Sequence, residues 1–275
     1  MTIREAVRAA GTRLEGAGVD TPLHDASEML AYLLDENALM MRMNGHRELD
    51  ADVFARYDAM IDRRVKREPM QYILGTAAFM GLEFHVEPGV LCPRPDTEIL
   101  CEEALRHIHE KSRVLDIGTG SGALAVSLAK HGGCSVTAVD VSDIALRVAA
   151  GNAERNGAHV RFVRSDCFSA LGGETFDVIV SNPPYISGEE MKTLMPEVKQ
   201  EPELALYGGE DGLDFYRRIS REAGAYLAPG GVLLFEIGWQ QKDAVSALLA
   251  QHIGEPKALK DYGGNWRVVY AEKEI

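Results

Sequence analysis

The sequence predicts an α/β fold: a doubly wound, mostly parallel sheet preceded by a small N-terminal helical bundle. From Val114 onward, short apolar runs alternate with stretches of helical periodicity, which is typical of parallel strands joined by crossover helices. Residues 1–67 instead contain only apolar stripes with helical spacing. Two short strand-like runs on either side of Pro88-Gly89 lie between these regions and predict a β-hairpin linker.

Residues 1–67 are predicted to form the helical domain because apolar residues recur three and four positions apart. The stripes consist of Ile3, Ala6, Val7, Ala10 and Leu14, then Leu23, Ala26, Leu30, Leu33 and Leu34, and finally Phe54, Tyr57 and Ile61. Such stripes form a core and carry no chemistry. A separate helical module beside a catalytic domain is often a partner-recognition element, so we expect that role for this domain. Residues 68–92 are the predicted linker, with strands at 79–86 and 90–92.

Residues 93–275 are predicted to form the sheet domain. Pro93-Arg94-Pro95 precedes its first helix, with Asp96 or Thr97 as the N-cap. Strands are expected at 114–117, 136–139, 160–163, 178–181, 232–237 and 266–271. Helices are expected from the glycine-rich loop to about Lys130, after Ser142, over 215–227, and up to about Gln251. Pro229-Gly230-Gly231 is expected to end the third of these helices.

Composition and charge narrow the class of protein. The formal net charge of −13 and the pI of about 5.1 argue against stable binding of nucleic acid. The basic cluster at 63–67 is interpreted as a solvated helix C-terminus, and a contact for an acidic partner is the alternative. No run of 18 apolar residues and no signal-peptide pattern is present, so neither a membrane span nor secretion is expected. The four cysteines form no C-x-x-C pair, which predicts no metal site and fits a reducing cytoplasm.

A glycine loop joins the first strand of the sheet domain to its helix. It comprises Gly118, Thr119, Gly120, Ser121 and Gly122 and follows Asp116. Glycine permits positive φ and close approach of a ligand, and Asp140 at the end of the next strand can accept hydrogen bonds from a ribose diol. Asp116 can face the amino group of a methionine-type ligand. The spacing G-x-G-x-G alone leaves S-adenosylmethionine, a dinucleotide and a purely structural turn as alternatives.

Asp166-Cys167-Phe168 follows the third strand of this domain. An Asp at a strand end can accept a hydrogen bond from an adenine amino group, and the apolar neighbours can cover the ring. An ordinary loop with two buried residues is the alternative. Cys167 is a poor candidate for a nucleophile, because no basic residue adjacent in sequence would lower the pKa of its thiol.

Asn182-Pro183-Pro184-Tyr185 is the most informative stretch of the chain. It follows the apolar run at 178–181, at the carboxyl end of a strand, where open α/β sheets bind ligands. The two prolines stiffen the turn, so the Asn182 carboxamide and nearby carbonyls point in fixed directions. That arrangement suits binding of a planar –NH₂ group, with the Tyr185 ring against its plane. The alternative is a proline-rich turn with a capping asparagine.

The loop, the acid and N-P-P-Y together resemble amino-group methyltransferases that use S-adenosylmethionine. Further motifs resemble the HemK/PrmC family over nearly the whole chain. They are the stretch from Arg67 to Gly75, the run from Phe79 to Phe84, Pro93-Arg94-Pro95-Asp96-Thr97-Glu98, and the run from Glu201 to Leu213. The resemblance implies a Rossmann-like class I methyltransferase domain. It also implies methylation of the glutamine side-chain amide nitrogen in the Gly-Gly-Gln loop of class I peptide chain release factors, with S-adenosyl-L-homocysteine as the other product.

Residue by residue, the resemblance places Gly118, Thr119, Gly120, Ser121, Gly122, Asp140, Asp166, Cys167 and Asn182 at the cofactor. Asn182, Pro183, Pro184 and Tyr185 match the substrate-amide site, with Asn182, Pro183 and Tyr185 as the catalytic group. The chain departs from some relatives at Cys167, where a bulkier ring would cover more of the adenine. Phe168 is expected to compensate.

Three other functions fit part of the pattern. A methyltransferase acting on adenine or cytosine in nucleic acid would use the same N-P-P-Y chemistry on a flipped base. A NAD-dependent dehydrogenase would use the glycine loop but leaves N-P-P-Y without a role. The third is a non-enzymatic binding module that retains a cofactor-binding fold. The glycine loop, the acid and N-P-P-Y are all intact, which argues against such a loss of activity. We further expect a monomer, because no exposed apolar helix stands out.

Overall fold

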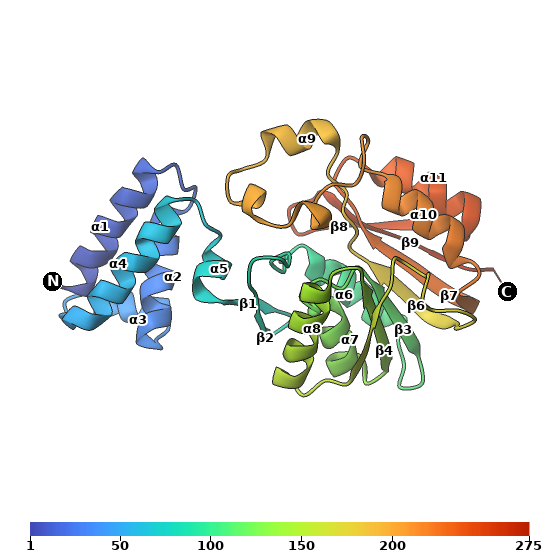
Figure 1. The fold of residues 1–275 in the computed structure, drawn as a ribbon, viewed down its shortest axis with the longest axis horizontal. Coiled ribbons are helices and arrows are strands. Elements are labelled where there is room, and N and C mark those ends of the chain that lie inside the picture. The colour runs from blue at the N-terminus through green and yellow to red at the C-terminus, as the bar shows by residue number, and fades with distance from the viewer. Residues whose placement is uncertain (275) are drawn as a thin grey trace. The chain divides into compact units, whose positions relative to one another are not determined.

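The computed structural model describes residues 1–274, which form two compact units (Figure 1). The first unit comprises Met1–Gly75 and Met195–Gln200, and the second comprises Thr76–Leu194 and Glu201–Ile275. Among the described residues, no helix is long and apolar enough to cross a membrane.

The first unit is helical, as its stripes predict. Its helices are α1 (Ile3–Gly16), α2 (Pro22–Leu34), α3 (Ala38–Met43), α4 (Ala51–Val65) and α5 (Met70–Leu74). Thr2 caps α1 through a reciprocal capping box with Glu5. The predicted stripe residues Ile3, Leu14 and Leu30 are fully buried and form one core with Tyr57. Periodicity therefore identified most of the inward faces, but Leu23, which was also assigned to a core stripe, is 59% exposed.

The basic cluster at the end of α4 is a solvated helix end only in part: Arg63 and Lys66 are exposed, but Arg64 and Arg67 form ion pairs within the protein. Arg64 is buried, and its Nε donates to Asp25 Oδ2 at 2.8 Å while Nη1 lies 2.9 Å from Glu197 Oε1. Arg67 forms a bidentate pair with both oxygens of Glu197, at 2.6 Å each. The cluster thus holds the 195–200 segment within this unit. A contact 130 residues apart in sequence leaves no local signal, which is why this part of the prediction was wrong.

The second unit begins with a short antiparallel hairpin, β1 (Thr76–Phe79) and β2 (Leu82–His85). The sequence predicted a strand over 79–86 paired with one at 90–92, and these bounds were wrong. The turn lies at Met80-Gly81, where both residues have positive φ, 50° and 73°. Gly81 allows that turn, whereas Pro88-Gly89 lies outside the strands. Phe79 and Phe84 pack into the core of this unit.

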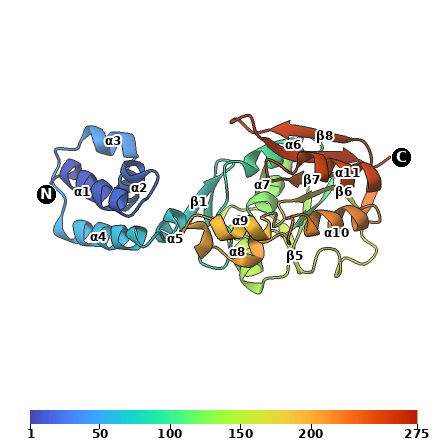
Figure 2. The same ribbon diagram turned by 90° about the horizontal axis from the view of Figure 1, so that it is seen from above.

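A seven-stranded sheet with strand order β5-β4-β3-β6-β7-β9-β8 forms the centre of the second unit. Its strands are β3 (Arg113–Ile117), β4 (Ser135–Asp140), β5 (Val160–Arg164), β6 (Phe176–Ser181), β7 (Leu227–Glu236), β8 (Pro256–Lys260) and β9 (Trp266–Glu272). Strands β3 to β7 are parallel, and β9 is antiparallel to both β7 and β8. Figure 2 shows β5 and β8 at opposite ends of the sheet. The predicted doubly wound, mostly parallel sheet is confirmed.

Helices cover both faces of this sheet. They are α6 (Thr97–Arg106), α7 (Ala123–Gly132), α8 (Asp143–Arg155), α10 (Asp214–Ala223) and α11 (Lys242–His252). The short helix α9 (Gly188–Thr193) has no buried residue, and 3₁₀ turns follow at Val198–Gln200, in the first unit, and at Glu203–Ala205. Neighbouring residues of β3 belong to opposite cores: Val114 packs with α6 and α7, and Leu115 packs with α10 and α11. Burial on both faces explains why the strands read as continuous apolar runs.

Two parts of the sheet differ from the prediction. Pro229-Gly230-Gly231 lies within β7 instead of ending a helix, because α10 already ends at Ala223. The register of β6 against β7 shifts at this point, so the proline interrupts no regular ladder. Strand β8 was not predicted. It is a half-buried edge strand, Pro256 to Lys260, whose two lysines interrupt its apolar pattern.

Candidate active site

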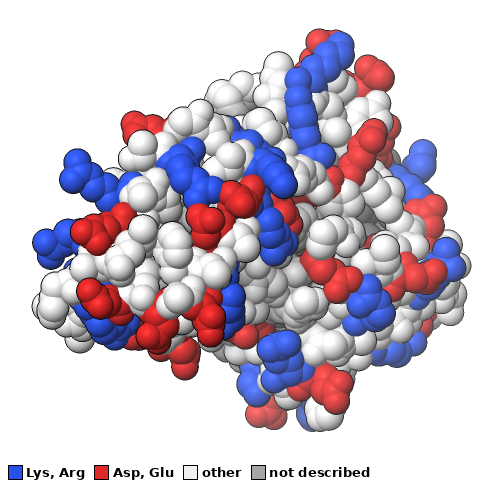
Figure 3. All heavy atoms as spheres, turned by 60° about the vertical axis from the view of Figure 1, so that its left-hand side comes forward, with Lys and Arg blue, Asp and Glu red and all other residues white. Residues whose placement is uncertain are grey.

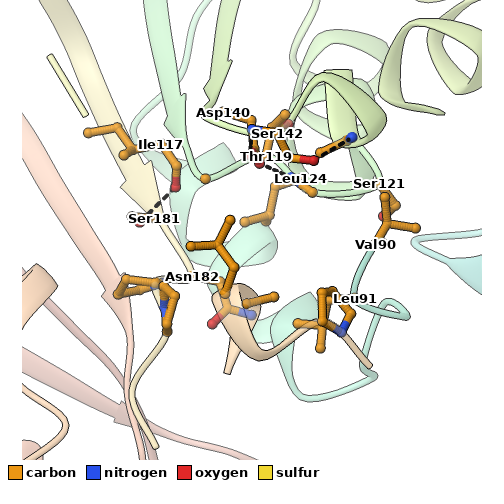
Figure 4. A pocket seen from close by; sticks show the side chains of 18 of the residues that line it. Val90, Leu91, Ile117, Thr119, Ser121, Leu124, Asp140, Ser142, Ser181 and Asn182 are labelled. Carbon is orange, nitrogen blue, oxygen red and sulfur yellow. Dashed lines mark hydrogen bonds between the residues drawn. The ribbon is translucent and has the colours of Figure 1, made fainter. Parts of the chain in front are cut away.

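A cavity of about 340 Å³ opens at the carboxyl ends of β3, β4 and β6, within the second unit (Figure 4). Ten of the predicted site residues line it: Gly118, Thr119, Gly120, Ser121, Asp140, Asp166, Cys167, Asn182, Pro183 and Pro184. Gly122 and Tyr185 are outside this lining. Figure 4 shows Thr119, Asp140 and Ser142 on one side of the cavity and Asn182 on another. Because parallel strands end at one edge, residues distant in sequence converge here.

The glycine loop is an open cradle. Gly118 and Gly120 have φ of 76° and 55°, and a Cβ added at either position would meet no atom within 4 Å. The positive φ values favour glycine, and the space in front of them is free for a ligand. Gly122 has a different role, since its added Cβ would lie 2.8 Å from Ala149 Cβ. Gly122 therefore lets α7 start close to α8.

Asp140 fixes the shape of this loop. Its Oδ2 accepts a hydrogen bond from Gly120 N and its Oδ1 one from Ser142 N, both at 2.9 Å. Each carboxylate oxygen has a second lone pair, so two further donors can bind from the cavity side. Ser142 also caps α8 by accepting from Ala145 N, as the sequence predicted.

Asp116 lies beneath the loop and is completely buried. Its Oδ2 accepts from Thr119 Oγ1 at 2.7 Å, but its Oδ1 has no hydrogen-bond partner among residues 1–274. Burial raises the pKa of this carboxyl to about 7, against the lowering effect of the Thr119 hydrogen bond. A buried acceptor without a partner is costly and indicates a site for a donor that is bound during function.

The Asp166 segment only partly follows the prediction. Asp166 Oδ1 accepts from Arg218 Nη1 at 2.6 Å, a contact that the sequence did not indicate. Cys167 is buried with φ of 50°, and burial raises the pKa of its thiol to about 11, which disfavours the nucleophilic thiolate. Phe168, which was expected to compensate for the small Cys167, does not line the cavity. Its ring is directed into the core, where it stacks on Tyr226 at 4.5 Å between centroids.

The N-P-P-Y segment is held from several sides. At its start, Ser181 Oγ donates to the Ile117 carbonyl at 2.8 Å and joins the ends of β6 and β3 (Figure 4). At its end, the Tyr185 carbonyl accepts from Gln241 Nε2 at 2.9 Å. A Cβ on Gly208 would lie 2.5 Å from the Pro184 carbonyl oxygen, so only glycine permits this approach. The turn is therefore rigid through contacts as well as through its prolines.

Two residues that the sequence reasoning missed hold the polar groups of this segment. Thr97, the first residue of α6, accepts at Oγ1 from Asn182 Nδ2 at 3.2 Å. Glu236, the last residue of β7, lies with Oε1 3.5 Å from the Tyr185 hydroxyl. A glutamate within the apolar run at 232–237 was the signal that could have identified Glu236, since buried carboxylates concentrate at functional sites.

Comparison with known proteins agrees with this geometry. The Methyltransferase small domain family matches residues 81–201, and the PrmC N-terminal domain family matches residues 5–75. A methyltransferase structure from Pyrococcus furiosus is 24% identical, with a TM-score of 0.58 over 82% of this chain and all of that chain. The structure of a 16S rRNA methyltransferase from T. thermophilus, in complex with AdoMet and guanosine, is 27% identical, with a TM-score of 0.53 over 72% of this chain and 50% of that one. The fold and the site thus define a Rossmann-like class I methyltransferase.

Full-length relatives identify the family. A release factor glutamine methyltransferase from Geobacter sulfurreducens is 43% identical over 91% of this chain and 89% of its own length. One from Koribacter versatilis is 41% identical over 99% of both chains. The chain belongs to the family of release factor glutamine methyltransferases.

Proposed function

We propose that this enzyme transfers a methyl group from S-adenosylmethionine to the side-chain amide nitrogen of the glutamine in the Gly-Gly-Gln loop of class I release factors. The observation that carries this is the Asn182 carboxamide, fixed at the wall of a cavity that the glycine cradle also lines. Paired acceptors on a stiff turn suit a planar –NH₂ group, which the primary amide of a glutamine side chain offers. The helical first unit is proposed to recognise the release factor.

The residues present fit S-adenosylmethionine. The unpartnered Asp116 Oδ1 can accept from the cofactor's ammonium, directly or through water. The open space in front of Gly118 and Gly120 can accommodate the methionine part, and Asp140 retains acceptor capacity for the ribose diol. Asp166 and Cys167 are proposed to lie beside the adenine, with Asp166 also paired to Arg218. Bound S-adenosylmethionine supplies a methyl carbon that its sulfonium already activates.

The protein's part in the reaction is alignment and local electrostatics. An amide nitrogen is a poor nucleophile, because its lone pair is delocalised into the carbonyl. Asn182 Oδ1 and the Pro183 carbonyl accept the two amide hydrogens and hold the nitrogen's π lobe toward the methyl carbon. As the C–N bond forms and the bond from the methyl carbon to sulfur breaks, with its electron pair left on the thioether of S-adenosyl-L-homocysteine, the nitrogen becomes more positive. These acceptors would therefore bind the transition state more strongly than the ground state. Tyr185 lies outside the cavity lining and packs against the core, so we assign its ring to holding the turn. The proton leaves to water or through the acceptors.

The affinity for S-adenosylmethionine is expected to depend on pH through Asp116. The ionised carboxylate binds the ammonium, and its pKa in the free protein is raised to about 7. Affinity should therefore fall as the pH is lowered through about 7, approaching a tenfold loss per unit below it. Titration calorimetry between about pH 6 and about pH 8 measures this dependence. In Asp116→Asn the affinity should be lower and nearly independent of pH over that range, whereas an unchanged pH dependence would contradict the assignment.

The substrate is tested directly by incubating the enzyme with labelled S-adenosylmethionine and a class I release factor. Mass spectrometry should locate one added methyl on the glutamine of the Gly-Gly-Gln loop. A release factor with Gln→Asn at that position is the matched control, because it keeps the amide but shortens its reach, and it should remain unlabelled. Methylation elsewhere on the factor would contradict the proposed substrate.

The nucleic-acid alternative is tested in the same assay with DNA or RNA as acceptor. The surface gives it no support, because acidic and basic side chains are interspersed on the face drawn in Figure 3 and the net charge is −13. A polyanion is bound most strongly by a continuous basic face. We expect no label on either nucleic acid, and efficient labelling of one of them would favour the alternative.

A further inference from the structure

The side chain of Gln241 joins three segments of the chain at the end of the N-P-P-Y turn. Gln241 lies between β7 and α11, and its Nε2 donates to the Tyr185 carbonyl at 2.9 Å and to the Gly212 carbonyl at 3.2 Å. Its Oε1 accepts from Gly238 N at 3.0 Å. Both N–H groups of the carboxamide are thus used, and these three hydrogen bonds form a clamp on the turn.

The neighbours of the Gln241 carboxamide determine which end is the nitrogen. A carbonyl oxygen can only accept and a backbone N–H can only donate, so the two carbonyls require Nε2 and Gly238 N requires Oε1. The backbone of Gln241 is fixed as well. Its N donates to the Gly238 carbonyl at 2.8 Å, and its carbonyl accepts from Val245 N at 3.0 Å in α11. The two donors therefore reach the turn from an anchored position.

The glycine-containing run after N-P-P-Y packs against the same turn. A Cβ on Gly212, which has φ of 73°, would lie 2.3 Å from the Tyr185 carbonyl oxygen and 2.7 Å from Gln241 Nε2. Only glycine allows the loop, the carbonyl and the carboxamide to meet here. One residue beyond Tyr185, Ile186 N donates to the Leu206 carbonyl at 2.9 Å. This run therefore forms the other side of the clamp.

The turn depends on such contacts because Pro183 and Pro184 have no N–H and donate no hydrogen bond of their own. The Asn182 end is held through its side chain, at 3.2 Å, and the Tyr185 end is held by Gln241. The Pro183 carbonyl, which we propose as an acceptor for the substrate amide, lies between these two ends. Its direction is therefore set by how both ends are held.

We propose that Gln241 is a positioning residue for methyl transfer, which sets the direction of the Pro183 carbonyl by holding the Tyr185 carbonyl against Gly212. The inference rests on the proposed function and names a residue outside the N-P-P-Y segment on which that site depends. Gln241 does not line the cavity, so it acts on the substrate amide only through the turn.

Gln241→Glu tests the inference, because it keeps the shape and removes the donors. An ionised carboxylate cannot donate to the two carbonyl oxygens that it would face, so the clamp should open. We expect kcat for release-factor methylation at about pH 8 to fall about 10- to 100-fold. The cofactor Kd should stay within about threefold, because the glycine cradle and Asp140 are unchanged. Gln240→Glu is the matched control: it makes the same change one position away, on an exposed residue outside the cavity lining, and its kcat should not change.

The loss in Gln241→Glu should also depend on pH. Partial burial and two facing carbonyls favour the neutral form of the introduced carboxyl and raise its pKa, and the protonated form can donate to one carbonyl. At saturating cofactor, the ratio of variant to parent kcat should therefore rise at least about threefold from about pH 8 to about pH 6. Gln241→Met, which removes the donors without adding a titratable group, should show the loss but no recovery.

The ratio is compared because other groups titrate in both proteins. Burial raises the pKa of Glu236 to about 7, within the range tested. The charged and titratable groups on the elements around position 241 are Tyr185, Asp211, Asp214 and Tyr216 on α10, Glu236 on β7, Lys242 and Asp243 on α11, and Arg267 on β9. Unchanged kcat in Gln241→Glu, or a loss of equal size at both pH values, would overturn the proposal.

Gly212→Ala tests the clamp from its other side. Its Cβ would separate the loop from the Tyr185 carbonyl, so kcat should again fall about 10- to 100-fold with little change in the cofactor Kd. Gly264→Ala is the matched control, because Gly264 also has positive φ, 84°, but an added Cβ there would meet no atom within 4 Å. It shares the backbone strain without the crowding, and its kcat should stay near that of the parent. Near-normal kcat in Gly212→Ala would contradict the inference.

A further readout needs no substrate. In glutamine-labelled protein, the Nε2 protons of Gln241, assigned by their absence in Gln241→Met, should be protected from exchange. Protection should be lost in Gly212→Ala and kept in Gly264→Ala. Unprotected Nε2 protons in an enzyme that methylates its release factor would overturn the inference and leave the function intact. Protected protons in an enzyme that methylates no release factor would refute the proposed function while supporting the clamp.

Discussion

Replacing Asn182 with alanine is expected to lower kcat for release-factor methylation by roughly 10²–10³, the cost of one preorganised polar group at a reacting centre. The loss should appear in kcat, because Asn182 Oδ1 binds the developing positive charge on the nitrogen more strongly than the neutral amide. The cofactor Kd should change much less, since Asp116, Asp140 and the glycine cradle remain. Single-turnover methylation of a release factor, with calorimetry for the cofactor, measures both quantities.

Asn265→Ala is the matched control for this variant. Asn265 is exposed in the turn before β9 and does not line the cavity, so its loss should leave kcat unchanged. Near-normal turnover in Asn182→Ala would rule out the acceptor role of the carboxamide. A large loss of cofactor affinity with little change in kcat would instead assign Asn182 to cofactor binding alone.

Replacing Asp140 with alanine is expected to weaken S-adenosylmethionine binding by about 100-fold, equivalent to about 3 kcal/mol. The variant loses the proposed acceptor for the ribose diol and the two bonds that shape the loop, from Gly120 N and Ser142 N at 2.9 Å. At saturating cofactor, kcat should recover to within about tenfold, because the N-P-P-Y segment does not depend on Asp140. Titration calorimetry with S-adenosylmethionine measures the loss.

Asp143→Ala provides the comparison. Asp143 is three residues further along, is exposed, does not line the cavity and pairs with Arg164 at 3.3 Å. Its removal changes the net charge by the same amount as Asp140→Ala, and the cofactor Kd should not change. If Asp140→Ala binds the cofactor with normal affinity, the ribose assignment is wrong.

Local patterns predicted most of the fold. Apolar residues with a period of about 3.6 residues identified the helical unit, and short apolar runs identified six of the strands. Each pattern reflects which side of an element is buried. Edge strand β8 and the Met80-Gly81 turn were missed, since a partly polar edge strand and an unusual turn pair have weak local signatures. The ion pairs of Arg64 and Arg67 were missed because their partner Glu197 is distant in sequence.

In the site, too, the sequence predicted some features, and others depended on contacts between residues distant in sequence. The sequence alone determined that the glycine loop, Asp140 and N-P-P-Y lie together, because parallel strands bring their carboxyl ends to one edge of the sheet. Only the tertiary structure decided which groups hold Asn182 and Tyr185. Thr97 is 85 residues from Asn182 and Glu236 is 51 residues from Tyr185, and hydrogen bonds over such separations depend on side-chain packing in three dimensions. Periodicity records which face of an element is buried, but it does not record which polar group a buried side chain meets there.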